Sequence, residues 1–381
     1  MPQIKPKNSA REITQKIFER DGGHFIRLDE NSACPFLTEE NFCKIQREHG
    51  EEYLSVTCTT YPRRTFDFGD FFERSLTLTC PVVAALVLLN QEPMKFEEIE
   101  VSPKIHNNNR KIKAMKPDMV LHTNISSYFR TIQTGAISIL QERDLTIDER
   151  LILLGLYLDR LDEILKNKNY EEIEKIVPVY TSEDFLKNDF KGFIETLNFN
   201  AENYVKMIFN VIYSIYGEEN SQFAFKDQNF IDSVNWVFNL HPDNNGQLLI
   251  KDIAARYKEL EKLRTDFINY FSTVFENYLV NEFFMNLYPF KIPHSTMQNY
   301  GLFVTVYKLV EILTFCHCVD KFTNDAQAKN FTEQKKKIDL SAAVMQITTN
   351  LDHNNEYMNR IIKNLEGKDD VIEIMESLLQ K

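Results

Sequence analysis

Four of the six cysteines in the chain fall within one short stretch, and their thiols are the groups here best suited to chemistry. They are Cys34, Cys43, Cys58 and Cys80. Cys34 and Cys80 are each followed directly by a proline. Four thiolates can complete a tetrahedral zinc site or hold an iron–sulfur cluster. The stretch is therefore a candidate metal site.

Three interpretations of these cysteines remain open. They could be buried small hydrophobic residues, since free cysteine packs readily in protein cores. Disulfides require an oxidising compartment, and the first residues contain no apolar run that could serve as a signal peptide. We therefore expect a cytoplasmic protein with free thiols. A zinc site usually includes two cysteines separated by two to four residues, which this stretch lacks, so the spacing favours an iron–sulfur cluster over zinc.

The elements around the last two cysteines could position further groups. Arg63 follows Pro62, and we expect a rigid turn to hold its charge near the thiolates of a cluster; the alternative is an exposed arginine. A predicted hairpin over 66–78 leads to Cys80, and Pro81 is suited to the first position of a following helix. A thiolate at a helix N-terminus is stabilised by the helix dipole.

The remaining sequence predicts a mainly α protein with two regions. Residues 1–103 form a small cysteine-rich α+β region with a β-hairpin, a short amphipathic helix over 10–20, a strand over 24–28 and a helical segment over 50–58. Residues 104–117 form a basic linker, and residues 118–381 form a large all-helical domain. Within the helical domain, Thr146 and Glu149 predict a capping box. Further helices are predicted over 125–141, 182 onward, 203–215, 250–279, 302–318, 340–365 and 370–379.

The composition of the chain limits the classes of function that it can have. The chain has 381 residues with a formal net charge of −12, which argues against nucleic-acid binding, and 43% hydrophobic residues, which supports a substantial core. No apolar run reaches the length needed to cross a bilayer, the longest candidate being 82–89, so no membrane insertion is expected. Cys316 and Cys318 are two residues apart on a predicted helix, which predicts one core and one surface position.

Several of these motifs, taken together, resemble the flagellin lysine-N-methylase family. In the cysteine-rich stretch the matching segments are Cys34-Pro35-Phe36-Leu37, Cys43-Lys44-Ile45-Gln46, Cys58 with Tyr61-Pro62-Arg63, and Cys80-Pro81. Downstream they are Glu276-Asn277-Tyr278-Leu279-Val280-Asn281, Leu287-Tyr288-Pro289-Phe290 and the segment around His353-Asn354. The resemblance covers most of the chain, although residues 100–260 match only in helical character.

The resemblance implies a protein-lysine N-methyltransferase. Its substrate would be the surface lysines of flagellin, its methyl donor S-adenosylmethionine, and its four cysteines would hold a [4Fe–4S] cluster. The candidates for a catalytic base are then Tyr278, Glu276 and His353. Each has a structural alternative: core packing for Tyr278, a helix-surface charge for Glu276 and a helix cap for His353.

Two departures keep a second class of function open. Most doubly wound methyltransferases hold S-adenosylmethionine with a glycine-rich turn, and no such motif occurs here. Members of the family often carry a further cysteine cluster near the N-terminus, and nothing in this sequence corresponds to it. Aromatic side chains could hold the sulfonium instead, and we expect the cluster to be structural because the compact three-cysteine motif of radical enzymes is absent. The alternative is a non-catalytic cluster- or zinc-bearing binding or sensor protein.

Overall fold

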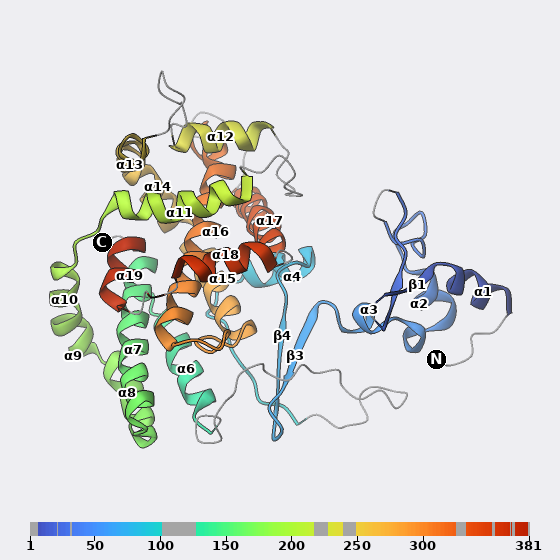
Figure 1. Cartoon of the computed structure of the whole chain (residues 1–381), viewed down its shortest axis with the longest axis horizontal. Helices are drawn as coiled ribbons and strands as arrows, with labels where there is room; N and C mark the ends of the chain where they lie inside the picture. The colour runs from blue at the N-terminus through green and yellow to red at the C-terminus, as the bar shows by residue number, and fades with distance from the viewer. Residues whose placement is uncertain are drawn as a thin grey trace. The chain divides into compact units, whose positions relative to one another are not determined.

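A computed structural model describes residues 7–20, 22–30, 33–100, 127–216, 228–238, 249–324, 333–352, 355–365, 367 and 370–379. The chain forms two compact units (Figure 1). Unit one comprises Met1–Thr65 with Glu97–Met115, and unit two comprises Phe66–Phe96 with Lys116–Lys381. The predicted basic linker, 104–117, lies outside the described residues.

Unit one is small and contains short elements. Its helices and strands are α1 (Lys7–Gln15), β1 (Ile17–Arg20), β2 (Gly23–Ile26), α2 (Lys44–His49), the single 3-10 turn η1 (Glu51–Tyr53) and α3 (Val56–Thr60). Strands β1 and β2 pair antiparallel, with Ile17 opposite Ile26. The predicted helix over 10–20 therefore ends early, because Ile17 and Phe18 pair with the facing strand. The predicted helical segment over 50–58 is likewise divided, because Ser55 caps the start of α3.

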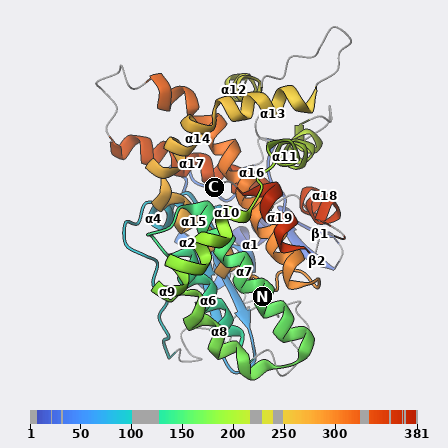
Figure 2. The same ribbon diagram turned by 90° about the vertical axis from the view of Figure 1, so that its left-hand side faces the viewer.

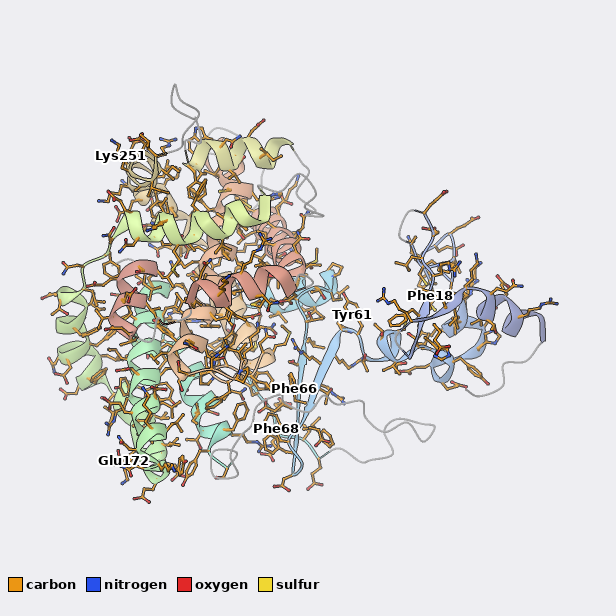
Figure 3. All side chains as sticks on the ribbon, viewed as in Figure 1. Phe18, Tyr61, Phe66, Phe68, Glu172 and Lys251 are labelled. Carbon is orange, nitrogen blue, oxygen red and sulfur yellow. The ribbon has the colours of Figure 1, made fainter. Side chains whose placement is uncertain are left out.

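A β-hairpin and the helix after it carry Cys80. The hairpin consists of β3 (Arg63–Asp67) and β4 (Phe72–Leu76), as predicted, and α4 (Pro81–Leu88) follows with Pro81 in its first turn. Phe66 and Phe68, labelled in Figure 3, pack with aromatic and apolar residues of unit two. The buried side chains of α4 belong to the core of unit two. Compact unit two therefore begins at Phe66 and includes Cys80, and unit one also takes up Glu97–Met115.

The rest of unit two is helical, as the sequence predicts. After α4 its elements are α6 (Phe129–Leu140), α7 (Ile147–Asn167), η2 (Tyr170–Glu172), α8 (Ile173–Tyr180), α9 (Glu183–Phe185), the π-helical turn η3 (Leu186–Phe190), α10 (Lys191–Thr196), α11 (Ala201–Tyr216), α12 (Gln228–Phe238), α13 (Ile250–Glu259), α14 (Glu261–Tyr270), α15 (Ser272–Met285), α16 (Thr296–Asn324), α17 (Glu333–Asp352), α18 (Asn355–Leu365) and α19 (Val371–Leu378). The predicted fold class, mainly α with a small α+β N-terminal region, is confirmed.

Helix α16 is the central element of unit two. It contacts helices on all its sides, namely α7, α11, α12, α14, α15, α17, α18 and α19 (Figures 1 and 2). Its segment Thr296–Val319 is long and apolar enough to cross a membrane, and 94% of its most apolar window is buried inside the protein, as in a core helix. This run differs from the expectation that the longest apolar run is 82–89, because Lys308 and Glu311 interrupt it in the sequence. Cys316 and Cys318 are both buried, so the predicted surface position is wrong: neighbouring helices surround α16.

The predicted helix over 250–279 is three helices in the structure. Breaks occur at Leu260 and Phe271, where the chain leaves helical geometry at the ends of α13 and α14. Both residues remain buried, so apolar spacing continues across the breaks and hides them in the sequence. The predicted helix over 340–365 divides in the same way into α17 and α18. The break at Phe271 precedes α15, which carries two of the three candidate catalytic bases, Glu276 and Tyr278.

Candidate functional site

Cys34 and Cys43 lie at the two ends of one closed loop in unit one. The Lys44 backbone N–H donates to the Phe36 carbonyl at 2.8 Å, and Leu37 and Cys43 form an isolated antiparallel bridge. Both cysteines are half-buried against the small core formed by Phe36, Ile45 and Leu54. The loop thus brings two of the predicted ligands to the same apolar cluster.

The other two predicted ligands lie elsewhere. Cys58 is exposed on α3, where its backbone N–H donates to the Ser55 hydroxyl at 3.2 Å. Cys80 is the N-cap residue of α4 and packs against the core of unit two, which confirms its predicted place at a helix N-terminus. Arg63 is exposed at the start of β3.

Four free thiols supply the chemistry that an iron–sulfur cluster or zinc requires, and none of the four is in a disulfide. Cys34, Cys43 and Cys58 lie in unit one, and Cys80 lies in unit two. Within the described ranges, no three His, Cys, Asp or Glu residues gather closely enough to hold a metal ion. The thiols of unit one, although close in sequence, are therefore not preassembled as a ligand set, and the four-cysteine metal site stays a prediction.

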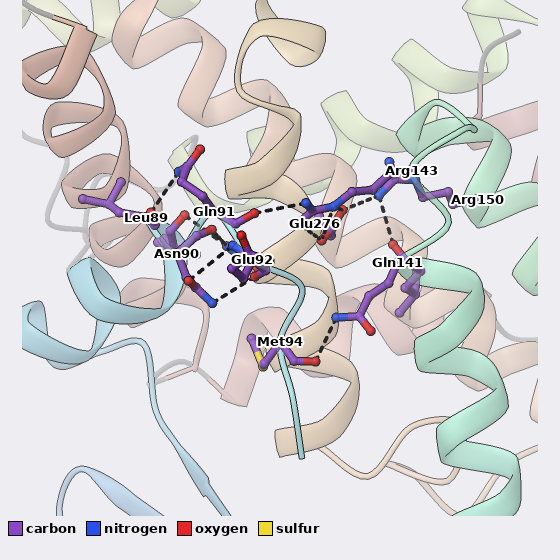
Figure 4. Close-up of polar contacts among 12 residues, drawn as sticks. Leu89, Asn90, Gln91, Glu92, Met94, Gln141, Arg143, Arg150 and Glu276 are labelled. Atoms are coloured by element: carbon purple, nitrogen blue, oxygen red, sulfur yellow. Dashed lines mark hydrogen bonds and ion pairs between the residues drawn. The ribbon is translucent and has the colours of Figure 1, made fainter. Parts of the chain in front are cut away.

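Glu276, in the middle of α15, is held by two arginines (Figure 4). The Arg143 guanidinium donates through Nη2 to Oε1 at 2.7 Å and through Nε to Oε2 at 3.0 Å, and Arg150 Nη1 donates to Oε2 at 2.8 Å. The Glu276 side chain is 2% exposed and that of Arg150 is 4% exposed. Hydrogen bonding to Glu276 raises the pKa of Arg143. Glu276 is therefore a buried, paired charge and not a helix-surface charge.

Hydrogen bonds around this ion cluster hold together segments that are distant in sequence. Arg143 Nη1 also donates to the Gln91 carbonyl at 3.0 Å, and the adjacent Asn277 amide donates to the Asn90 carbonyl at 2.8 Å. Gln141 Nε2 donates to the Met94 carbonyl at 3.0 Å. These bonds attach the segment after α4 to α15 and to the end of α6 (Figure 4). With both carboxylate oxygens accepting from guanidinium groups, Glu276 has a structural role in this arrangement.

Tyr278 lies two residues further along α15 and is fully buried. Burial raises the pKa of its hydroxyl well above its usual range, and the charges of Glu282 and Asp352 raise it further. A phenol with a raised pKa keeps its proton at neutral pH. Tyr278 is therefore suited to donating a hydrogen bond and not to accepting a proton as a base.

Glu282 is a second buried carboxylate on α15, and its environment differs from that of Glu276. Its Oε1 accepts from the Asn286 amide at 2.6 Å and lies 3.5 Å from Lys291 Nζ. Its Oε2 is buried and receives no hydrogen bond from the described residues. A buried carboxylate oxygen without a donor is costly, and such groups are concentrated at functional sites. This oxygen is the least satisfied acidic group on the helix.

Tyr288 follows α15 and lies close enough to Glu282 for the carboxylate charge to affect the ionisation of its hydroxyl. Burial raises the pKa of the Tyr288 hydroxyl well above its usual range, and the carboxylates of Glu282 and Asp352 raise it further. Its hydroxyl, like Glu282 Oε2, is buried without a hydrogen-bond partner among the residues described here. Lys291 Nζ lies 5.2 Å from the centre of the Tyr288 ring. A carboxylate, an aromatic ring and an ammonium group thus meet at the end of α15; we call Glu282, Tyr288 and Lys291 the ammonium site.

The third candidate base, His353, lies outside the described residues. Its neighbour Asp352 is the last residue of α17. The negative charge of Asp352 helps to raise the pKa of the Tyr278 and Tyr288 hydroxyls. Two of the segments quoted from the sequence, the α15 signature and the block at residue 352, are therefore neighbours in the fold. The sequence did not predict that Asp352 lies near Tyr278 or near Tyr288.

The members of the ammonium site were not singled out in the sequence. A usable signal exists in the sequence, because apolar residues occur on every face of α15, and a helix of this kind is expected to be buried. Charged residues within it are then expected to be paired or functional, because burying an unpaired charge is costly. Glu282 meets that condition as well as Glu276 does. The partners of Glu276, Arg143 and Arg150, are more than 120 residues away and had no signal in the sequence.

Comparison with known proteins identifies the family. The sequence model described as the FliB lysine N-methylase C-terminal domain matches residues 133–380, which is more than half of the chain. The chain belongs to this family. The match includes α15 and the ammonium site, and it begins after the cysteine-rich stretch.

Individual relatives match over shorter segments. A lysine-N-methylase of Salmonella typhimurium strain LT2 is 27% identical over 108 residues, which is 25% of this chain and 26% of that protein. The flagellar biosynthetic protein FliU of Salmonella muenchen is 29% identical over 85 residues, which is 22% of this chain and 50% of that protein. The alignments thus span between about a quarter and half of these relatives' own lengths. No solved structure matches the chain significantly.

Proposed function

We propose that this protein is a protein-lysine N-methyltransferase that transfers methyl groups from S-adenosylmethionine to surface lysines of flagellin. The observation that carries the proposal is the family match over residues 133–380. The name of the Salmonella muenchen relative, a flagellar biosynthetic protein, supports a flagellar substrate. We place the reaction in the cytoplasm, where flagellin is present before export.

The chemistry of the proposed reaction sets three requirements. The lysine ammonium must lose a proton so that its nitrogen lone pair is free to attack. The amine must be held in line with the methyl group. Water must be excluded from the reacting groups. When bound, S-adenosylmethionine would supply the methyl group on a positively charged sulfonium.

Unit two contains groups suited to the first and third requirements. Glu282 is a buried carboxylate with one oxygen open to a donor, and Tyr278 and Tyr288 are buried phenols beside it. The end of α15 is therefore a water-poor environment with a proton acceptor. Among the described residues the strands form only two-stranded sheets, so the methyl donor would bind outside a doubly wound fold.

The test is intact-mass analysis of flagellin incubated with the protein and S-adenosylmethionine. We expect mass gains in steps of one methyl group, dependent on the methyl donor and absent with heat-inactivated protein. Flagellin from the same source is the appropriate substrate, and a lysine-free peptide is the negative control. Tight binding of flagellin without any mass gain would instead support a non-catalytic binding protein.

The cluster is a separate proposal. We propose that Cys34, Cys43, Cys58 and Cys80 hold a [4Fe–4S] cluster with a structural role. The support is the thiol chemistry and the resemblance of this stretch to the family's cysteine-rich segment. The three cysteines of unit one are not gathered as a ligand set among the described residues, so they would have to come together when the cluster binds. No step of methyl transfer is assigned to it.

A further inference from the structure

We infer that Glu282 and Tyr288 form the pocket that receives the ammonium group of the substrate lysine, and that the protein's own Lys291 occupies this pocket when no substrate is bound. The inference rests on the proposed function for the identity of the incoming group. It adds the residues that receive it. The pocket lies wholly within unit two, on α15 and the segment that follows.

The first line of evidence is the set of contacts that Lys291 makes. Its Nζ lies 3.5 Å from Glu282 Oε1 and 5.2 Å from the centre of the Tyr288 ring. An anionic acceptor together with an aromatic face is the combination by which proteins recognise alkylammonium groups. Lys291 therefore already shows how a lysine side chain is held at this place.

The second line of evidence is that Lys291 leaves the pocket incompletely satisfied. The ion-pair distance of 3.5 Å is longer than that of a charge-assisted hydrogen bond, which is about 2.8 Å. Glu282 Oε2 and the Tyr288 hydroxyl are both buried and accept or donate no hydrogen bond within the described part of the chain. An ammonium group has three N–H donors. A better-placed ammonium could satisfy the Glu282 oxygen that Lys291 does not reach.

The third line of evidence is that the Lys291 side chain is more exposed than that of its partner Glu282. The Lys291 side chain is 17% exposed, whereas that of Glu282 is 2% exposed. Lys291 thus extends from the protein surface to the buried carboxylate. If its side chain swings out, a lysine of another protein can enter along the same path, with its ammonium directed at Glu282.

The chemical step at this pocket is then defined. The incoming ammonium donates one proton to the Glu282 carboxylate, which becomes a neutral carboxylic acid, and its nitrogen becomes a neutral amine. The nitrogen lone pair forms a bond to the methyl carbon of the sulfonium donor. The carbon–sulfur bond breaks, and its electron pair remains on sulfur, giving a neutral thioether and a methylated ammonium.

The test is direct binding of a lysine side-chain model, Nα-acetyl-lysine methylamide, measured by NMR titration of the full chain. The Lys291→Met variant keeps most of the side-chain stem but removes the competing ammonium, so it should bind the probe more tightly than the wild type. A gain of about tenfold to a hundredfold is expected, the range that one charge-assisted hydrogen bond contributes. The matched control is Lys258→Met, which removes an exposed lysine on α13 and should leave probe binding unchanged.

A second substitution separates recognition from general loosening of the fold. Adding Glu282→Gln to Lys291→Met should abolish the gain in probe affinity. The neutral amide of glutamine cannot form an ion pair with the ammonium group of the probe. Nα-acetyl-norleucine methylamide, which lacks the amino group, should bind neither variant. If Glu282→Gln prevents folding, Tyr288→Phe in the Lys291→Met background takes its place and should reduce the gain.

The outcomes distinguish this inference from the proposed function. Equal probe binding by Lys291→Met and the wild type would overturn the inference, even if flagellin is methylated. Tight probe binding by Lys291→Met that depends on Glu282 would support the pocket, even if no methyl transfer to flagellin is found. In the second case the proposed function would be wrong and the lysine pocket would remain.

Discussion

At the scale of single residues, the two carboxylates of α15 have opposite surroundings. Glu276 accepts hydrogen bonds on both oxygens from Arg143 and Arg150, whereas Glu282 has one oxygen without a donor among the described residues. The two residues lie on the same helix and are equally buried. The difference lies in their hydrogen bonds. Glu276 is fully paired and stabilises the fold, whereas Glu282 has one oxygen that could accept a proton or a hydrogen bond from a substrate.

Removing Glu276 should destabilise the protein strongly. In Glu276→Ala the buried guanidinium of Arg150 loses its counter-charge, and breaking a buried ion pair costs about 3 to 5 kcal/mol. The measurement is the free energy of unfolding from urea denaturation. The matched control is Glu163→Ala, whose side chain is 56% exposed in its ion pair with Arg160, so the expected change is at most about 1 kcal/mol. Similar losses in the two variants would contradict the structural role of Glu276.

Glu73 should make the stability depend on pH. It lies buried on β4, near Gln133 of α6, and burial raises its pKa to about 7, while Gln133 and Arg130 act in the opposite direction. Because the folded state binds this proton more tightly than the unfolded state does, the contribution to stability is complete below about pH 4.5 and is lost as the pH rises to about 7.

The Glu73→Gln variant tests this dependence. Gln cannot ionise, so the variant should gain stability relative to the wild type as the pH rises from about 4.5 to 7, by an amount on the order of 3 kcal/mol. The measurement is thermal or urea unfolding of both proteins at several pH values. Exposed Glu163→Gln provides the control and should show no such trend. A constant difference between Glu73→Gln and the wild type across this pH range would exclude a raised pKa.

At the scale of elements, α7 shows what could be read from the sequence. Thr146 accepts a hydrogen bond from the Glu149 backbone N–H, and the Glu149 side chain accepts one from the Thr146 N–H, so the predicted capping box is confirmed. The local signal sufficed because both partners lie within one helical turn. The same holds for Pro81 in the first turn of α4 and for the β3–β4 hairpin.

The capping box leads to a prediction about stability. Thr146→Ala removes the side-chain acceptor at the start of α7 and should reduce the free energy of unfolding by about 1 kcal/mol. Thr146→Ser retains the hydroxyl and should stay within a few tenths of a kcal/mol of the wild type. Urea denaturation of the three proteins measures both differences. Equal losses in the Ala and Ser variants would show that the hydroxyl does not cap the helix.

Elements that depend on distant partners could not be predicted. The breaks at Leu260 and Phe271 lie within an apolar pattern that continues across three helices. The central place of α16 follows from contacts with helices before and after it in the chain. Within α16, Lys308 lies 2.5 Å from an Asp148 carboxylate oxygen of α7 and 2.8 Å from one of Glu311. Sequence spacing carries no information on the contact with Asp148, 160 residues away.

At the scale of the whole molecule, the fold class and the family were accessible from the sequence, whereas the place of Cys80 in unit two was not. Cys80 follows the other three cysteines closely in sequence, yet the helix that it caps packs in the core of unit two. Apolar residues such as Val83 and Leu88 decide that division, because they are buried against helices that come later in the chain.

The cluster proposal belongs to this scale. Anaerobically purified protein should contain iron and sulfide, and replacing any one of Cys34, Cys43, Cys58 or Cys80 by Ala should lower both. Cys318→Ala, a buried cysteine of α16 outside the set, is the control and should leave iron content unchanged. Since metal binding and folding are linked, removing iron with a chelator should lower the thermal stability. Stoichiometric zinc without iron would contradict the proposal.

The most direct test of the central claim is transfer of an isotope-labelled methyl group from S-adenosylmethionine to flagellin, followed by acid hydrolysis and quantification of labelled N-methyl-lysine. The wild type and the exposed control Glu163→Gln should produce labelled methyl-lysine at equal rates. Glu282→Gln, confirmed to be folded by its far-ultraviolet circular dichroism, should produce at least about a hundredfold less, as expected when a general base is removed. No labelled methyl-lysine from the wild type with its metal content restored would contradict the proposed function.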